Sequence, residues 1–193
     1  MIEEPSLQTL IDIANHPTLS QRLTEVIIDL HGYRTGGLGF DAEPSQSLYV
    51  GGYAPRDLLI ATGQARDMLV EAFSKLPSLE TIGLRDYDAN GRVRDGERAR
   101  WRSYGATFAG DNGVTLVNPD QEFPLLLQAL GLAGAKPKSI EVFLRRNHIS
   151  LNSFNVLSNR MAPVVIPVLS NLRTLMLSIT SETLYGTSPE NPT

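Results

Sequence analysis

The segment with the sharpest chemical pattern in the chain runs from Asp86 to Glu97. It matches the calcium-loop pattern D-x-[DN]-x-[DN]-G-x₅-E, in which oxygen ligands converge on a hard cation and glycine permits a sharp turn. The candidate metal ligands are Asp86, Asp88, Asn90 and Glu97. A calcium loop of this type joins two helices, but the residues before Asp86 have the spacing of a strand, and Arg92 and Arg94 place cations inside the loop. We therefore favour a polar loop that closes a strand over a calcium site, and we expect no bound metal.

The wider loop at 85–104, which contains this segment, is rich in arginine and aromatic residues, the types found most often at protein-binding hot spots. A surface of this kind could also bind bases or phosphates. Because acidic residues are interleaved with the arginines, we favour a self-contained network of ion pairs, with Trp101 packed as an anchor, over a partner contact. The candidate partner-binding residues are Arg85, Tyr87, Arg92, Arg94, Trp101, Arg102 and Tyr104 in this loop, and Arg145 further along the chain.

No set of residues in the chain has the spacing of an active site. His16, His31 and His148 are scattered, and the chain has no cysteine to act as a ligand, a nucleophile or a disulfide partner. The glycine-rich segment 36–39 lacks the G-x-G-x-x-G spacing of a nucleotide loop, and no serine stands in a G-x-S-x-G motif. We therefore expect a protein that is not an enzyme, with no catalytic residue and no cofactor.

Composition limits the partners that the chain can have. The formal net charge of −4 over 193 residues is small, and it gives no reason to expect nucleic acid or an anionic membrane as a partner. The longest apolar stretch, Val164 to Leu169, is far shorter than the ~20 residues that span a bilayer. The first residues are acidic and lack the basic segment and apolar run of a signal peptide. We expect an intracellular protein, cytoplasmic or nuclear, with no membrane partner.

One spacing of apolar residues recurs along the chain and predicts its architecture. The pattern is L-x-x-L-x-x-L-x-L, whose last positions alternate as in a strand. Its copies are Leu76–Leu84, Leu169–Leu177, a shifted one at Leu23–Leu30 and a weaker one at Ile140–Leu144. Alternation sends neighbouring side chains to opposite faces, so outer-row residues such as Thr81, Gly83 and Arg85 should be exposed. The inner-row residues, which should be buried, are Val26, Ile28, Ile82, Leu84, Val142, Leu144, Leu175 and Leu177.

Each strand pattern follows a segment with the i, i+3, i+4, i+7 spacing of a helix. These segments are Leu7–Ala14, Ala65–Leu76, Phe123–Leu130 and a short one, Phe154–Met161, that ends at Pro163. Alternation of helix and strand predicts a parallel sheet with helices on one side. The strand patterns recur at uneven intervals, so insertions at 32–55 and 86–119 must interrupt a repeat that ordinarily has about 20–29 residues. We predict an α/β fold, namely an irregular leucine-rich-repeat-like solenoid fragment with parallel strands on one face and helices on the other.

The solenoid is expected to fill residues 1–180 as part of a longer repeat array, followed by a polar, disordered tail at 181–193. If no later strand pairs with the copy at Leu169–Leu177, the edge of that strand is open. An open edge is a liability in a complete protein, so we expect the array to be incomplete here.

Three blocks of the sequence resemble the C-terminal recognition region of a large group of fungal F-box proteins. The blocks are Ser6–Ile28, which includes His16-Pro17; Leu76–Tyr87, which is followed by Arg94-Asp95-Gly96 and by Trp101–Gly105; and Leu157–Leu175, which includes Met161-Ala162-Pro163. In such proteins an N-terminal F-box docks on the Skp adaptor of a cullin ubiquitin ligase, and the repeat region selects the protein that is ubiquitinated. An F-box usually opens with Leu-Pro and a short acidic helical run, which this chain lacks. The resemblance thus implies a substrate-recognition region, with a Skp adaptor as partner only if an F-box lies upstream.

We therefore expect a protein–protein interaction module that holds a protein partner through exposed strand residues and the loop at 85–104. The alternative is a stand-alone repeat scaffold with no ubiquitin role. A calcium-binding protein that uses the loop at 86–97 is the third hypothesis, and the sequence supports it least.

Overall fold

The computed structural model describes residues 2–33, 56–86, 114–116, 119–144, 149–150, 153–154 and 160–178. Its centre is a four-stranded sheet in which all neighbouring strands are parallel. The strands are β1 (Glu25–Asp29), β3 (Thr81–Arg85), β5 (Ser139–Phe143) and β6 (Thr174–Leu177). They stand in the sheet in the order β1-β3-β5-β6, which is also their order along the chain. The predicted α/β fold with four parallel strands is confirmed.

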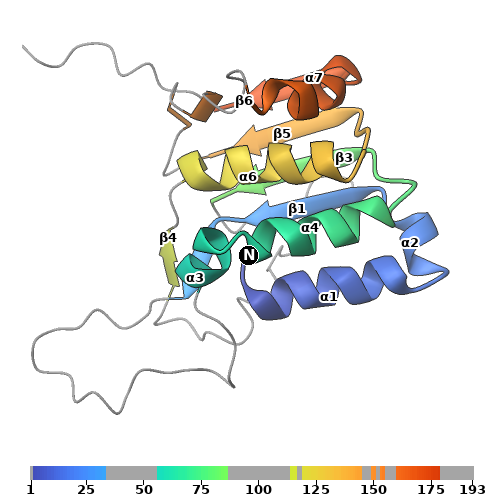
Figure 1. Ribbon diagram of the computed structural model, residues 1–193, viewed down its shortest axis with the longest axis horizontal. Coiled ribbons are helices and arrows are strands. Elements are labelled where there is room, and N and C mark those ends of the chain that lie inside the picture. The colour runs from blue at the N-terminus through green and yellow to red at the C-terminus, as the bar shows by residue number, and fades with distance from the viewer. Residues whose placement is uncertain are drawn as a thin grey trace, which may run out of the picture.

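A helix precedes each strand of this sheet. The four helices are α1 (Glu4–Asn15), α4 (Gln64–Ser74), α6 (Pro119–Leu132) and α7 (Ala162–Ser170), and two shorter ones are α2 (Leu19–Arg22) and α3 (Arg56–Ala61). In Figure 1 the four longer helices form one layer in front of the sheet, in the same order as the strands behind them. This arrangement agrees with the predicted separation of strands and helices. None of the helices in the described ranges is long and apolar enough to cross a membrane.

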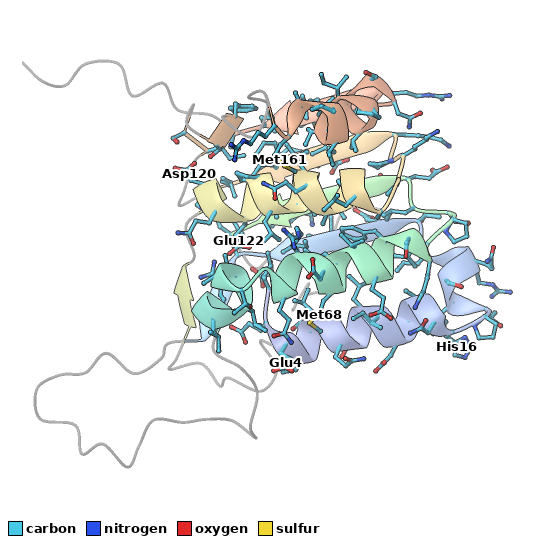
Figure 2. The ribbon with its side chains drawn as sticks, viewed as in Figure 1. Glu4, His16, Met68, Asp120, Glu122 and Met161 are labelled. Carbon is cyan, nitrogen blue, oxygen red and sulfur yellow. The ribbon has the colours of Figure 1, made fainter. Side chains whose placement is uncertain are left out.

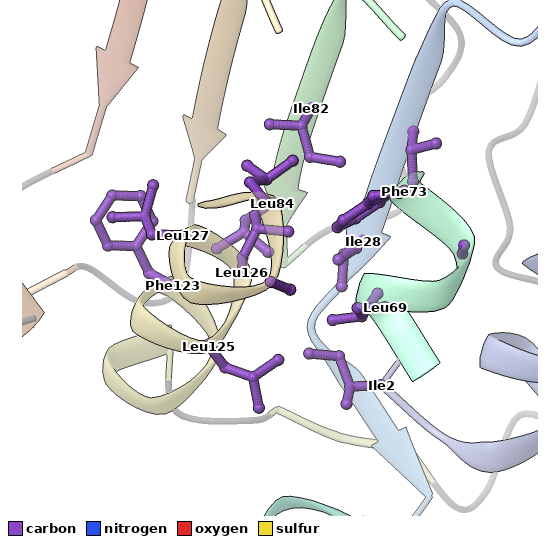
Figure 3. Packing of buried hydrophobic residues seen from close by; sticks show 14 of the residues in the cluster. Ile2, Ile28, Leu69, Phe73, Ile82, Leu84, Phe123, Leu125, Leu126 and Leu127 are labelled. Carbon is purple, nitrogen blue, oxygen red and sulfur yellow. The ribbon is translucent and has the colours of Figure 1, made fainter. Parts of the chain in front are cut away.

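The core lies between the sheet and the helix layer. Two rows of buried side chains point from the sheet toward the helices, Val26-Ile82-Ile140 and Ile28-Leu84-Val142. They pack with Leu69 and Phe73 from α4 and with Leu126 from α6 (Figure 3). Burial of one such side chain stabilises the fold by about 1.5–3 kcal/mol. The prediction of burial is confirmed for Val26, Ile28, Ile82, Leu84 and Val142.

The predicted burial is wrong at the far end of the sheet. Leu175 is 49% exposed, and Leu144 and Leu177 are only half-buried. The strand β6 has a neighbour, β5, on one side only, so within the described ranges no strand covers its other flank. Alternation in a sequence reports which face a side chain takes, but it does not report whether a neighbouring strand lies beside it.

The last helix begins where the sequence predicts that it ends. The apolar stripe Phe154–Met161 predicts a helix that stops at Pro163, but α7 spans Ala162–Ser170 and has Pro163 in its first turn. Proline is favoured there because the first N–H groups of a helix have no partner inside it, and because the φ angle of proline suits a helix. Residues 153–154 form only a 3₁₀ turn. The prediction that Pro163 ends a helix is therefore wrong, and residues 155–159 of the predicted helix lie outside the described ranges.

A second, small sheet follows the end of β1. The strand β2 (His31–Tyr33) comes directly after Leu30 and pairs antiparallel with β4 (Val114–Leu116). The sequence pattern assigns most of these residues to insertions and predicts no second sheet. A strand of three residues is too short to show the alternation by which strands are recognised. Since β4 comes shortly before α6, this pairing joins the start of one insertion to the end of the other.

The edge at which the strands of the main sheet begin, called the amino edge below, is built from short connections. They are residues 16–24, 75–80, 133–138 and 171–173. The carbonyl oxygen of the residue before each strand accepts two backbone N–H groups from the neighbouring unit. The two donors are the residue before the next strand of the sheet and the first residue of that strand. These acceptors are Thr24, Glu80 and Lys138, and the donors are the residue pairs 80–81, 138–139 and 173–174, at 2.7–3.1 Å. The same hydrogen-bonding arrangement thus occurs three times in succession.

Candidate functional site

The face of the main sheet that points away from the core has no helix against it among the described residues. Alternation along each strand places a mixed set of side chains there. This set, called the helix-free face below, consists of Glu25, Ile27 and Asp29 on β1, Thr81, Gly83 and Arg85 on β3, Ser139, Glu141 and Phe143 on β5, and Thr174 and Met176 on β6. Acidic, basic, hydroxyl and apolar groups therefore share one surface.

The centre of the helix-free face depends on a glycine. A Cβ atom at Gly83 would lie 2.7 Å from the Cδ1 atom of Ile27 and 3.0 Å from the carbonyl oxygen of Glu141. Because Gly83 has no side chain, Ile27 reaches across from β1 and lies over β3. The Oγ atom of Ser139 donates a weak hydrogen bond of 3.3 Å to the Oε1 atom of Glu141, beside this contact. The face is thus packed at its centre and polar around it.

The predicted exposure of the outer row is wrong in part. Thr81 is half-buried, but Gly83 and Arg85 are buried. For Gly83 the reason is the Ile27 side chain that packs over it. Arg85 is at the end of β3 and makes polar or electrostatic contacts within the protein. A buried cation is retained where the protein offers it partners, so Arg85 fits the ion-pair interpretation of its loop better than a freely exposed contact.

The opposite edge of the sheet, where the strands end, carries most of the buried polar side chains and is called the carboxyl edge below. Arg85 and Asp86 stand at the end of β3, and Asp86 is 0% exposed. Glu3 immediately before α1 and Glu122 in the first turn of α6 are buried as well. Figure 2 shows the helices α1 and α6 beginning at this side, with Glu4, Asp120 and Glu122 on them, whereas His16 lies at the amino edge. In parallel α/β sheets, ligands bind beyond the carboxyl ends of the strands.

A buried ion pair joins two helices at the carboxyl edge. The Nη2 atom of Arg56, at the start of α3, contacts the Oε1 atom of Glu122 on α6. The carboxylate of Glu122 is almost fully buried, and the guanidinium of Arg56 is mostly buried. A carboxylate in the first turn of a helix is also stabilised by the helix dipole. Glu122 therefore fixes the start of α3 against α6.

Asp120 fastens a second segment to the same helix. Its Oδ1 atom accepts a hydrogen bond of 2.8 Å from the backbone N–H of Ser150, and it also accepts one from the hydroxyl of Ser153. Asp120 lies in the first turn of α6, where an acidic residue is favoured by the helix dipole. Acidic residues near a helix start are a readable signal, but the partners Arg56, Ser150 and Ser153 lie far away in the sequence, and no spacing indicates them.

An open groove of about 370 Å³ lies between α3, the start of α4 and α6. Its lining is mixed, with Ile60, Gly63, Arg66, Asp120, Gln121, Pro124, Leu125 and Gln128. Arg66 is paired with its neighbour Asp67, and Asp120 holds the serines described above. The two charged residues of the groove, Arg66 and Asp120, are therefore engaged in the structure of the protein itself.

Of the candidate partner-binding and calcium-loop residues, only Arg85 and Asp86 lie within the described ranges. The partner-binding candidates outside them are Tyr87, Arg92, Arg94, Trp101, Arg102, Tyr104 and Arg145, and the calcium-loop candidates outside them are Asp88, Asn90 and Glu97. Their roles stay predictions. Within the described residues, no three histidine or carboxylate side chains are grouped so as to hold a metal ion.

The charged groups of the amino edge are exposed. Glu80 pairs with Lys138 across neighbouring connections, and both side chains are about half exposed. The hydrogen bond from Lys138 and its charge, with a smaller contribution from Arg173, lower the pKa of Glu80 below its ordinary value. His16 accepts the N–H groups of Thr18 and Leu19 at its Nδ1 atom, at 3.2 and 3.3 Å, which is a structural role at the end of α1. These groups join neighbouring connections of the amino edge.

Comparisons of the chain with protein-family models, with curated proteins and with solved structures find no match. The described geometry and the sequence are therefore the two sources for a functional proposal. They point to the helix-free face, with the carboxyl edge beside it, as the candidate functional site.

Proposed function

We propose that this chain is a protein-interaction module built as a solenoid of helix–strand units, and that it holds a protein partner on its helix-free face. The observation that carries the proposal is the one-sided arrangement of the fold. In the described ranges four helix–strand units follow one another in chain order, their helices α1, α4, α6 and α7 cover one face of the sheet, and the other face combines charged, hydroxyl and apolar side chains.

The succession of backbone contacts supports the solenoid part of this proposal. In a solenoid each unit contacts its neighbours in the same way, and the surface grows by one strand with each unit. The carbonyl groups of Thr24, Glu80 and Lys138 accept the same pair of N–H groups from the unit that follows. Leucine-rich repeats use such surfaces for binding, and the four units here are an irregular version with insertions at the carboxyl edge.

The chemistry of the helix-free face suits a protein surface better than a small molecule. Side chains on it are mostly half-buried, and they alternate in character over a sheet of four strands instead of converging on one point. Small-molecule sites are concave and enclose their ligand, whereas protein interfaces combine an apolar centre with a polar rim. Ile27, Phe143 and Met176 would supply apolar contacts, and Glu25, Asp29 and Glu141 would supply charge. The proposed role includes no catalytic step.

The resemblance to fungal F-box proteins supports a more specific version, in which the partner is a protein selected for ubiquitination. That version requires a Skp adaptor, bound through an F-box, and it would place the protein in the cytoplasm or nucleus. The alternative is a scaffold that binds a partner without any ligase. The two versions are distinguished by purifying the native gene product with a tag and measuring the Skp adaptor that is recovered with it by immunoblot. Stoichiometric recovery supports the ligase version, and absence of the adaptor contradicts it.

The binding face itself is tested by site-specific photo-crosslinking. A benzophenone amino acid replaces Ser139 on the helix-free face in one variant and Ser74, at the end of α4 in the helix layer, in a matched control. The proposal expects one defined protein adduct from position 139 in cells and none, or a different and weaker one, from position 74. Equal adducts from both positions, or no adduct from position 139, would overturn it. Circular dichroism melts establish that both variants are folded.

A further inference from the structure

The unit formed by α7 and β6 exposes apolar side chains. Leu175 and Met176 on β6 are 49% and 44% exposed, and Ile166 on α7 is 53% exposed. Leu175 points to the helix side of the sheet and Met176 to the helix-free face, because their partners on β5 are Ile140 and Glu141. Three of the six large apolar residues that are exposed in the described ranges therefore belong to this one unit. The end repeats of a solenoid ordinarily have a polar outer face.

The flank of β6 that faces away from β5, called the β6 flank below, also presents backbone groups. The N–H groups of Thr174 and Ser178 donate to carbonyl groups on the β5 side, each at 3.1 Å. Successive residues of a parallel strand face alternate neighbours, so Leu175 and Leu177 direct their N–H and C=O groups to the β6 flank. Among the described strands none lies there. An extended segment beside β6 would satisfy these groups.

The residue directly before each strand of the main sheet decides which charges meet at the amino edge. These residues, called the entry row below, are Thr24, Glu80, Lys138 and Arg173. They precede strands that pair in register, and such strands lie about 4.8 Å apart. Within the row, the acidic Glu80 is paired with its basic neighbour Lys138. Arg173 is the last member of the row, and its side chain is exposed.

Positive charge is in excess where the entry row reaches β6. Residues 160–178 contain two arginines, Arg160 and Arg173, and no acidic residue, and the connection before β5 adds Lys136 and Lys138. Glu80 is the one acidic member of the row and is hydrogen-bonded to Lys138, so its single charge cannot balance both Lys138 and Arg173. A surface with an excess of one charge selects partners of the opposite charge. The β6 flank therefore fits a segment that begins with an acidic residue.

We infer that the β6 flank binds an extended segment of a partner protein, which begins with an acidic residue, continues with apolar residues and adds a fifth parallel strand to the sheet. Strand addition of this kind takes its affinity from main-chain hydrogen bonds and its specificity from alternate side chains. The acidic residue would stand beside Arg173, as Glu80 stands beside Lys138. This surface goes beyond the proposed function, because it is a different one and binds its segment whether or not the helix-free face holds a partner.

The register of the sheet specifies the rest of the segment. Its second residue would lie beside Thr174, and its third and fifth residues would lie beside Leu175 and Leu177 on the helix side and should be apolar. Its fourth residue would lie beside Met176 and should be apolar as well. The chain contains such a sequence in its own sheet, since Glu80 is followed by a hydroxyl residue and by the apolar residues Ile82 and Leu84 at the corresponding positions.

The same register assigns each amide of the segment. The N–H of the second residue would donate to the Arg173 carbonyl, as Thr174 donates to Lys138, and the N–H of the fourth residue would donate to the Leu175 carbonyl. The N–H groups of Leu175 and Leu177 would donate to the carbonyls of the second and fourth residues. The N–H of the third residue would point away from β6. The second and fourth amides of the segment are therefore needed, and the third is not.

The peptide acetyl-Glu-Thr-Ile-Val-Leu-amide, titrated into the ¹⁵N-labelled full chain and followed by NMR, tests the inference. We expect saturable binding with a Kd below about 1 mM. The amide signals of Leu175 and Leu177 should shift, and their hydrogen exchange should slow when the peptide is bound, because they gain acceptors. A Kd above about 1 mM, or binding that leaves these two amides unchanged, would overturn the inference.

Two N-methylated peptides test the register. A methyl group on the nitrogen of the fourth residue removes the donor to the Leu175 carbonyl, so it should raise the Kd at least about tenfold. The matched control carries the methyl group on the nitrogen of the third residue, and its Kd should be unchanged. Equal effects of the two methyl groups would contradict a parallel strand in this register.

A charge exchange tests the acidic residue. Arg173→Glu should raise the Kd of the peptide about threefold or more, and a peptide with lysine in place of glutamate should bind this variant more tightly than it binds the unmodified chain. Arg22→Glu changes an exposed arginine before β1 and is the control, which should leave both Kd values unchanged. The same change in Kd for both variants would show that net charge alone governs binding and that Arg173 selects no acidic residue.

Hydrogen exchange without the peptide tests whether something else covers the β6 flank. The amides of Leu175 and Leu177 should exchange fast in the chain alone, at every concentration. Slow exchange in the dilute chain would show that another segment of the chain covers the flank. Exchange that slows as the concentration rises would show that a second copy covers it. Either result would overturn the inference.

Discussion

The two edges of the main sheet are built in different ways, although the same strands reach both. At the amino edge, connections are short, and one backbone arrangement occurs three times, at Thr24, Glu80 and Lys138. At the carboxyl edge, insertions leave the sheet, and the polar side chains Asp86 and Glu122 are buried. One edge repeats a hydrogen-bonding pattern of the main chain, and the other relies on individual side chains.

This difference indicates that the amino edge sets the architecture of the sheet and that the carboxyl edge is where side-chain contacts can give specificity. The backbone contacts at the amino edge depend little on residue type, so exposed positions there can change without loss of the parallel sheet. Contacts such as Arg56–Glu122 and Asp120–Ser153 depend on particular side chains. Function in α/β folds ordinarily resides in loops that a rigid scaffold positions. The carboxyl edge and the adjoining helix-free face are therefore the regions in which specificity is expected.

The largest effect is expected from breaking the buried ion pair of the carboxyl edge. Arg56→Ala leaves the Glu122 carboxylate buried without its cation, and removal of one partner of such a pair costs about 3–5 kcal/mol. We expect a loss of about 3 kcal/mol in the free energy of unfolding by urea. The double variant Arg56→Met with Glu122→Met should cost less than Arg56→Ala alone, because no buried charge remains. A loss below about 1 kcal/mol for Arg56→Ala would contradict a structural role for the pair.

A smaller effect is expected at the centre of the helix-free face. Gly83→Ala places a methyl group against the Cδ1 atom of Ile27, and overpacking of this kind costs about 1–3 kcal/mol. Thermal unfolding followed by circular dichroism measures the loss. Ile27→Ala removes the crowding atom, so the second substitution should reduce the cost of Gly83→Ala in a double-mutant cycle. Independent, additive effects would show that Ile27 does not lie over Gly83.

Loss of the exposed Glu80–Lys138 pair at the amino edge should change the stability of the fold only slightly, and the change should depend on pH. The lowered pKa of Glu80 means that its pairing with Lys138 stabilises the fold above the ordinary pKa of 4.5, and that this contribution is lost as the pH falls through the lower pKa of the folded state. Glu80→Gln should therefore lower the Tm slightly at pH 7, and the difference in Tm between the two proteins should shrink as the pH falls below 4.5. High salt should reduce the difference at pH 7, because the pair is exposed. A difference in Tm that does not shrink as the pH falls would contradict this origin.

Calcium should have the smallest effect. Asp86, the first position of the calcium-loop pattern, is fully buried at the end of β3 and already has a polar or electrostatic partner in the protein. A ligand that binds the folded state raises its stability, so we expect no shift in Tm on addition of calcium. A shift that Asp86→Ala abolishes would show that the polar-loop interpretation of residues 86–97 is wrong.

The fold was predictable from sequence where a pattern is local. Ile82 and Leu84 alternate within one strand, and the apolar stripe of α4 recurs at helical spacing, so both elements follow from neighbouring residues. Parallel pairing followed from the succession of helix and strand. Pro163 illustrates the limit, because one proline can end a helix or occupy its first turn, and the choice depends on what the following residues pack against.

The candidate site was less predictable, because its contacts join residues that are distant in the chain. Arg56 and Glu122 are separated by 66 positions, and no periodicity links them. The exposure of Leu175 depends on the presence of a neighbouring strand, which one strand's own sequence does not report. The burial of Gly83 depends on the length of the Ile27 side chain on another strand. Such features can be recognised only once the strands are assembled into the sheet.

The most direct test of the account compares the two faces of the sheet with the partner that photo-crosslinking at position 139 captures. Isothermal titration calorimetry would measure the Kd of this partner for the unmodified chain, for Glu141→Lys on the helix-free face and for Glu71→Lys on α4, which is exposed in the helix layer. A reversed charge within an interface raises the Kd at least about tenfold. We predict that increase for Glu141→Lys and an unchanged Kd for Glu71→Lys. Equal effects of the two variants, or an effect of Glu71→Lys alone, would contradict binding through the helix-free face.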